Sequence, residues 1–224
     1  MPLDTEKLVQ ATLRQQIVKQ IRQAILNRSL LPGERLVERE LAKQLGTSLT
    51  ATREALIQLE TEGLITKRPN ATTHVTQLTP NEVEQIFAVR RVLEKYAFEE
   101  AARLADNAEI RHLKDLHSAA LEAARTNDGV AYVAADLEWH EAVWRTTKNA
   151  FLAESLRRVV LPLFGFSSIE VATRKGFDLE HDAQSHAPLL KAIRAHDPVA
   201  AGVAFDKFVQ LWMRYELEGS TEED

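Results

Sequence analysis

The sequence predicts a mainly α-helical protein, with an N-terminal winged helix-turn-helix whose small wing has two strands and a C-terminal antiparallel bundle of about six helices. Three observations predict this fold. Apolar residues recur with helical spacing through most of the 224 residues. Glycine and proline interrupt that spacing where a helix-turn-helix would turn. A short β-branched segment lies near residues 64–76, and the residues after it show no strand-like alternation.

The predicted helix-turn-helix begins with a supporting helix over residues 9–27, where Ile17, Ile21 and Ile25 form one apolar stripe. Pro32-Gly33 ends that helix and turns the chain. A short second helix has apolar residues every four positions and ends at a glycine that can adopt the left-handed conformation: Val37, Leu41, Leu45 and Gly46. The first two helices therefore precede residue 48.

The third helix is predicted to start after Ser48, a favoured N-cap residue, and to stop at Gly63. Its apolar side consists of Ala55, Leu56 and Leu59, and its other side or margins hold Thr50, Thr52, Arg53 and Gln58. Residues 64–66 and 72–76 flank Pro69-Asn70 and read as a two-stranded wing. In such a unit the helix before the wing enters the major groove of DNA.

Charge is distributed unevenly along the chain. Residues 1–78 hold 11 Lys and Arg against 8 Asp and Glu, whereas residues 79–224 hold 17 against 25, which gives the chain its net charge of −5. The surplus of positive charge therefore lies in the part that would meet phosphate. On charge alone, a solvated basic surface without a partner remains an alternative.

A second domain is predicted to begin at residue 79, because Thr79-Pro80-Asn81-Glu82 combines an N-cap, a helix-starting proline and a capping-box glutamate. Later cap and turn signals divide the rest into six predicted helices: 80–105, 108–126, 130–147, 150–173, 179–195 and 198–217. We therefore assign residues 1–78 to the winged helix-turn-helix, residues 79–217 to a helical domain and residues 218–224 to a frayed acidic tail.

Composition excludes several classes of protein. The chain is 45% apolar and 27% charged, as in an ordinary soluble globular protein. It has no cysteine, which excludes disulfides and thiolate sites and fits a reducing compartment. The longest apolar stretch, residues 159–166, is far shorter than the ~20 residues of a membrane span, and residues 1–4 lack the features of a secretory signal. We expect a cytoplasmic protein without a membrane partner.

Three polar residues of the helical domain suggest a metal site. Asp136 and His140 are four residues apart and so share one face of a helix, and His186 on a later helix would complete the set. Oxygen and nitrogen ligands of this kind suit zinc, nickel or manganese, although the same spacing is common in surface hydrogen bonds. A metal-dependent hydrolase using these residues is one alternative function. Against it, Trp144 occupies the place of the second histidine in a His-Glu-x-x-His motif, and no phosphate loop or nucleophile elbow is present.

Residues 13–79 resemble the DNA-binding domain of the GntR family of bacterial transcription regulators. The resemblance rests on Pro32-Gly33-Glu34-Arg35-Leu36, Glu40-Leu41-Ala42, Arg53-Glu54-Ala55-Leu56 and Gly63-Leu64 in that order. It implies that Arg53 and Arg39 read guanine, and the other expected DNA contacts are Thr47, Ser48, Thr50, Asn70 and Thr72. The family commonly has arginine where this chain has Leu49 and an Arg-Gly pair where it has Ala71-Thr72, so we expect a different operator. Ion pairs of Arg53 and Arg39 with Glu54 or Glu40 are the alternative.

The helical domain resembles the all-helical FCD-type ligand domain in the FadR/VanR branch of the same family. The matching runs are residues 89–94, 136–140 and 186–193, with Asn149 and Asp197 at single positions. The resemblance implies a divalent metal (Zn, Ni or Mn) held by Asp136, His140 and His186, and a small organic acid bound with help from Arg90 and Asn149. The family's fourth ligand position is Phe208, which leaves three protein ligands. The alternative for Arg90 is an ion pair with Glu94, and core packing is the expected role of Trp139, Trp144 and Trp212.

These inferences predict a ligand-responsive transcription regulator, most simply a repressor, and not an enzyme. It would bind a near-palindromic double-stranded DNA operator as a homodimer, and a small carboxylate such as a sugar acid or dicarboxylate would act through the helical domain. A DNA-binding protein without a ligand is the remaining alternative.

Overall fold

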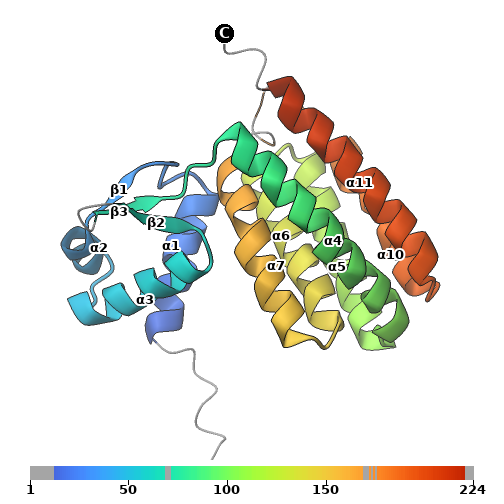
Figure 1. Cartoon of the computed structure of the whole chain (residues 1–224), viewed down its shortest axis with the longest axis horizontal. Coiled ribbons are helices and arrows are strands. Elements are labelled where there is room, and N and C mark those ends of the chain that lie inside the picture. Colours follow the sequence, from blue (N-terminus) through green and yellow to red (C-terminus); the bar gives the residue numbers. More distant parts are fainter. Residues whose placement is uncertain (1–12, 69–71, 169–171, 173, 175, 220–224) are drawn as a thin grey trace, which may run out of the picture. The chain divides into compact units, whose positions relative to one another are not determined.

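The computed structural model describes residues 13–68, 72–168, 172, 174 and 176–219. The chain divides into two compact units, residues 1–77 and 78–224 (Figure 1). Within the described residues, no helix is both long enough and apolar enough to cross a membrane.

The N-terminal unit has three helices, α1 (Leu13–Leu26), α2 (Glu38–Gln44) and α3 (Leu49–Thr61). Its core is formed by the predicted apolar faces of α1 and α3, namely Ile17, Ile21, Ile25, Ala55, Leu56 and Leu59. The Ser48 hydroxyl caps α3 by accepting a hydrogen bond from the Ala51 N–H at 3.1 Å. Gly46 and Gly63 have positive φ angles of 62° and 78° and end the preceding helices. These predictions are confirmed, and residues 9–12 of the first predicted helix lie outside the described part.

The sheet of this unit has three strands where the sequence predicted two. β2 (Ile65–Arg68) and β3 (Thr72–Val75) form the predicted antiparallel wing, and β1 (Arg35–Leu36) pairs with the other edge of β3. β1 has only two residues, too few to show the alternation by which a strand is recognised in a sequence. The extra strand ties the turn before α2 to the wing.

Thr52 is fully buried, which corrects its predicted place on the polar side or margin of the third helix. Its hydroxyl lies 3.0 Å from the Thr47 hydroxyl and donates to the Ser48 carbonyl at 3.1 Å. Because these local bonds satisfy the hydroxyl, a small polar residue fits in the core. Thr52 thereby fixes the first turn of α3 against the preceding loop.

The C-terminal unit is helical throughout its described residues (Figure 1). Its α-helices are α4 (Pro80–Leu104), α5 (Asn107–Arg125), α6 (Gly129–Thr146), α7 (Ala150–Leu163), α9 (Leu179–Ser185), α10 (Ala187–Arg194) and α11 (Pro198–Gly219). α6 packs against α4, α5 and α7, and α11 lies beside α4. The predicted capping boxes at Thr79 and Asp106 are both formed. Trp139, Trp144 and Trp212 are buried, as expected for core residues.

Two predicted helices are interrupted, and both interruptions follow from proline. The helix predicted over residues 150–173 is α-helical only to Leu163 and widens into a π-helical turn, η2 (Phe164–Ser168). Pro162 lies in its last turn and lacks the N–H that a regular helix would donate. The helix predicted over residues 179–195 is divided at His186, the residue before the first turn of α10, where Pro188 also lacks an N–H. His186 consequently lies at a junction between two helices.

Candidate functional site

The third helix of the N-terminal unit presents Arg53 to solvent. Arg53 has a side-chain exposure of 58%, and its Nε donates to Glu38 Oε2 of α2 at 2.6 Å. The ion-pair partner is therefore neither Glu54 nor Glu40, the two that the sequence suggested. An exposed pair of this kind contributes little to stability and leaves the arginine available.

The other expected DNA contacts lie on α2, around the start of α3 and on the wing. Arg39, Ser48 and Thr50 are exposed, and Thr47 and Thr72 are half-buried. The Thr72 hydroxyl lies 3.2 Å from His74 Nε2, so the wing threonine already has one polar contact. Asn70 lies outside the described residues.

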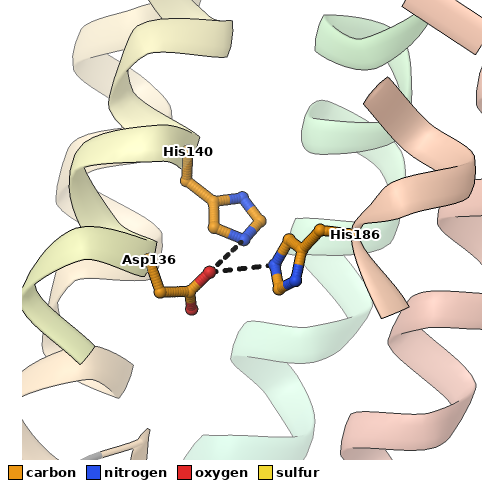
Figure 2. Close-up of side chains that lie close together, drawn as sticks. All are labelled: Asp136, His140 and His186. Carbon is orange, nitrogen blue, oxygen red and sulfur yellow. Dashed lines mark ion pairs between the residues drawn. The ribbon is translucent and has the colours of Figure 1, made fainter. Parts of the chain in front are cut away.

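In the C-terminal unit, Asp136, His140 and His186 meet in the interior, although 46 residues separate the two histidines in sequence. Asp136 and His140 point from successive turns of α6, and His186 reaches them from the α9–α10 junction (Figure 2). Asp136 Oδ1 lies 2.9 Å from His186 Nε2 and 3.7 Å from His140 Nε2. None of the three is more than 4% exposed. We call this set the Asp/His group.

The ligand atoms of both histidines lack hydrogen bonds. His140 Nε2 and His186 Nε2 are buried without a hydrogen-bond partner among the described residues. His186 Nε2 lies 2.9 Å from Asp136 Oδ1 as an ion-pair contact. Buried nitrogens of this kind are rare because an unsatisfied polar group is costly. A cation among the three ligand atoms, which lie within 4.8 Å of one another, would satisfy them.

Electrostatics keep Asp136 ionised in spite of its burial. Burial alone would raise the pKa of this carboxyl, but His186 and His140, together with Arg90, hold the pKa below its ordinary value. Burial would also lower the pKa of His186, and the Asp136 charge outweighs burial and holds the pKa above its ordinary value. The Asp136 carboxylate and the His186 imidazole therefore stabilise each other's charged forms.

Aromatic rings line the Asp/His group. The Phe208 ring centroid lies 4.6 Å from that of His186 and 5.7 Å from that of His140, so the residue at the family's fourth ligand position is a wall of the site. Trp139 packs edge-on against His186, and Phe164 of η2 packs against His140. These rings exclude water, which strengthens every charge interaction inside the site.

Arg90 and Glu94 on α4 form a second buried pair next to His140. Arg90 Nε donates to Glu94 Oε2 at 2.5 Å, and the two side chains are 4% and 0% exposed. Glu94 Oε1 also lies 2.7 Å from His140 Nδ1, within hydrogen-bond distance. Burial opposes ionisation of Glu94, but Arg90 and His140 lower its pKa to about 2. The Arg90–Glu94 ion pair, which was the alternative interpretation of Arg90 from the sequence, is therefore present. Through Glu94 it contacts His140 of the Asp/His group.

Asp182 is a site residue that sequence reasoning missed. It is fully buried on α9, Tyr132 donates to its Oδ2 at 2.5 Å, and its Oδ1 has no hydrogen-bond partner among the described residues. Burial raises the pKa of Asp182 to about 6. The only sequence signal was its position one helical turn before His186.

Asp182 should make stability depend on pH. Because its pKa in the folded protein is about 6 and its ordinary value is 3.8, the folded state binds the proton more tightly. Stability from this group is complete below pH 4 and is lost as pH rises through 6, by on the order of 3 kcal/mol. Asp182→Asn should therefore raise the free energy of unfolding at pH 7.5 and change it little at pH 4. Chemical denaturation of the chelator-treated protein measures both, and an equal gain at the two pH values would contradict the assignment.

Asn149 lies apart from this interior group. It is exposed at the start of α7, where its Oδ1 accepts from the Leu152 N–H at 3.1 Å and caps the helix. Asn149→Ala should lower the free energy of unfolding by about 1 kcal/mol, as loss of an N-cap does. Denaturant titration measures this loss. A simultaneous loss of carboxylate binding would show that Asn149 also contacts the effector, whereas unchanged binding would limit it to capping.

Comparison with known proteins gives the family. The model named "Bacterial regulatory proteins, gntR family" matches residues 13–75, and the FCD domain model matches residues 85–210. The chain belongs to the GntR family. This GntR regulator is a DNA-binding transcription regulator with an FCD ligand domain and not an enzyme, which removes the hydrolase alternative. FCD domains often bind metals or small ligands, and the Asp/His group lies within the matched range.

Relatives and solved structures agree with the family. The regulator is 29% identical to a "Probable D-xylose utilization operon transcriptional repressor" of Paenarthrobacter nicotinovorans, over 95% of this chain and 92% of that protein. It is 31% identical to the "Nta operon transcriptional regulator" of Aminobacter aminovorans, over 77% of this chain and 80% of that protein. The fold is similar to that of Escherichia coli McbR/YncC, with a TM-score of 0.83 at 19% identity, covering 94% of this chain and 100% of that one.

Proposed function

We propose that this GntR regulator is a homodimeric repressor whose affinity for its operator is controlled by a small carboxylate. The carboxylate would bind at a divalent metal held by Asp136, His140 and His186. The observation that supports this most directly is the pair of buried histidine nitrogens without hydrogen bonds, facing one ionised carboxylate. A cation would take both histidine nitrogens and the Asp136 carboxylate as ligands. The donor set of one oxygen and two nitrogens suits zinc, nickel or manganese.

A carboxylate is the ligand that best fits the surroundings of such a metal. Three protein ligands leave coordination positions for a ligand's oxygens, because Phe208 supplies none. Arg90 adds a buried positive charge on the same side, next to the ring of Phe208 at 5.7 Å. The two relatives named above regulate operons, and we propose that this chain likewise controls one operon in response to a small organic acid, such as a sugar acid or a dicarboxylate.

On the DNA side, we propose that Arg53 reads a guanine from the major groove, with Arg39 at the same site. Both arginines are exposed on the helix-turn-helix, and an arginine can donate to O6 and N7 of guanine together. Thr47, Ser48 and Thr50 surround the N-terminus of α3, where free N–H groups and hydroxyls suit phosphate. Thr72 and Asn70 are proposed as wing contacts.

Selection of duplexes from a random pool by the full-length protein tests this proposal. The expected winners contain two inverted half-sites about one helical turn apart, each with a guanine needed for affinity. Winners with a single half-site, or no enrichment above the starting pool, would contradict binding by a two-fold dimer.

We further propose that the dimer forms through the exposed face shared by α4 and α11, which we call the α4/α11 face. It carries five of the large exposed apolar side chains of the described residues: Val89, Val92, Tyr96, Val199 and Val203. An open groove of about 560 Å³ crosses it, with Arg91 and Lys95 beside Glu99 and Asp206. Because both signs of charge are present, a two-fold axis through the face would place the basic side chains of one copy opposite the acidic side chains of the other. A second copy of the chain is therefore the partner that this face fits.

Val92→Glu should weaken the dimer, because Val92 is 70% exposed in the single chain and would be buried between two copies. Sedimentation velocity should show a shift from dimer to monomer at micromolar concentration. Phe151→Glu is the matched control, since Phe151 is 85% exposed on α7 and outside this face. Dimers that survive Val92→Glu unchanged would place the interface elsewhere.

A further inference from the structure

We propose that Glu94 is a positioning residue that fixes the tautomer of the neutral His140 imidazole, so that this form directs its Nε2 lone pair toward Asp136 and His186. The metal-binding consequence rests on the proposed function. The tautomer itself does not, because it is set by hydrogen bonds present in the protein alone.

Glu94 accepts three hydrogen bonds in a fully buried position. Its Oε1 receives His140 Nδ1 at 2.7 Å and Trp144 Nε1 at 2.9 Å, and its Oε2 receives Arg90 Nε at 2.5 Å. Neither the indole nor the guanidinium can accept a hydrogen bond, so both must donate. Glu94 is therefore an acceptor at each of its oxygens.

The proton on His140 follows from this arrangement. With Glu94 acting only as an acceptor, the 2.7 Å contact requires a hydrogen on His140 Nδ1. A neutral imidazole has one N–H, so Nε2 carries the lone pair. That Nε2 is the atom that lies 3.7 Å from Asp136 Oδ1 without a hydrogen-bond partner. His140 Nε2 and Asp136 Oδ1 thus both direct lone pairs toward the position that a metal ion would occupy.

This arrangement matches the carboxylate–histidine–metal chains that orient ligands in metalloproteins. Glu94 sets the ring orientation of His140, while Arg90 neutralises the Glu94 charge in the interior. Arg90 is also the proposed effector-binding arginine. An effector carboxylate that pairs with Arg90 would therefore compete with Glu94 for the guanidinium. Because Glu94 contacts His140, this competition would connect effector binding to metal binding.

Nuclear magnetic resonance of ¹⁵N-histidine-labelled, metal-free protein tests the tautomer directly, with the His140 signals assigned by their absence in His140→Ala. The expected result is a proton on Nδ1 and none on Nε2. A neutral ring with its proton on Nε2 would overturn the proposal. This measurement needs no variant of Glu94, so the result is decisive even if such a variant does not fold.

Glu94→Gln gives the second test, because an amide offers a donor in place of a carboxylate oxygen. We expect the Nε2–H form of His140 to appear and the Zn²⁺ affinity, measured by calorimetry, to fall about 10–100-fold. Trp144→Phe is the matched control, since it removes another donor to the same oxygen and should change affinity less than about threefold. Unchanged tautomer and affinity in Glu94→Gln would overturn the role of Glu94. Wild-type protein that binds no Zn²⁺ while showing the Nδ1–H tautomer would refute the metal site and leave the hydrogen-bond assignment standing.

Discussion

Asp136→Asn should abolish divalent metal binding, with a loss larger than the ~10–100-fold caused by changes in residues that only hold the metal ligands in place. Asp136 Oδ1 lies 2.9 Å from His186 Nε2 and 3.7 Å from His140 Nε2. Its carboxylate is the anionic ligand of the Asp/His group. Asparagine keeps the shape of the side chain but removes the charge, and a neutral amide is a poor ligand for zinc or nickel. Calorimetric titration of chelator-treated protein with Zn²⁺, Ni²⁺ and Mn²⁺ measures the change.

The matched control for this experiment is Asp182→Asn. Asp182 is equally buried and lies one helical turn from His186, yet it is outside the set of ligand atoms that lie close together. Its replacement should leave metal affinity within a few-fold of the wild type. Equal losses in the two variants would mean that any buried negative charge suffices, and that Asp136 is not a ligand.

Arg53→Ala should weaken binding to the selected operator by ~1–3 kcal/mol, or roughly 5–150-fold, while the dimer stays folded. Arg53 is exposed on α3, and its bond to Glu38 is an exposed pair that DNA can replace at little cost. A bidentate contact with guanine has the expected strength. Fluorescence anisotropy with the operator and with a scrambled duplex of equal length measures the affinities.

The comparison between the two duplexes decides what Arg53 contacts. A loss confined to the operator indicates base reading, whereas equal losses on both duplexes would show that Arg53 meets only phosphate. Arg125→Ala is the control for removal of a positive charge, because Arg125 is 62% exposed in the other unit and pairs only weakly with Glu122. It should change neither affinity.

Most elements of the fold could be predicted because their signals are local. Ser48 and Thr79 form the predicted caps through bonds to residues within their own first helical turn. Gly46 has the positive φ angle expected of a glycine that ends a helix. Signals of this kind need no knowledge of the rest of the chain, which is why the described boundaries agree with the pattern.

The misplaced elements depend on contacts made at a distance or on weak local signals. Strand β1 exists because Arg35 and Leu36 pair with His74 and Thr73, almost forty residues further along. The division at His186 was missed because apolar spacing continues through it, although Pro188 disfavours the interior of a helix. Thr52 was assigned to the polar side or margin because its burial depends on the hydroxyl of Thr47.

The candidate site shows the same limit. The four-residue spacing indicated Asp136 and His140, and His186 was added as a candidate from a later helix that the family resemblance then supported. Glu94 had been considered solely as an ion-pair partner for Arg90, because nothing in the sequence indicates that α4 brings it against His140. Packing of α4 on α6 makes that contact, so the structure was needed to find it.

The most direct test of the account is the operator affinity of full-length wild type and His186→Ala, each measured with Zn²⁺ and with Zn²⁺ plus acetate, malate, succinate or gluconate. At least one of these carboxylates should weaken DNA binding by the wild type. His186→Ala should bind the operator as tightly as the ligand-free wild type, and none of the carboxylates should change its affinity. A full response in His186→Ala, or no response of the wild type to any of these acids, would contradict control of DNA binding by the Asp/His group.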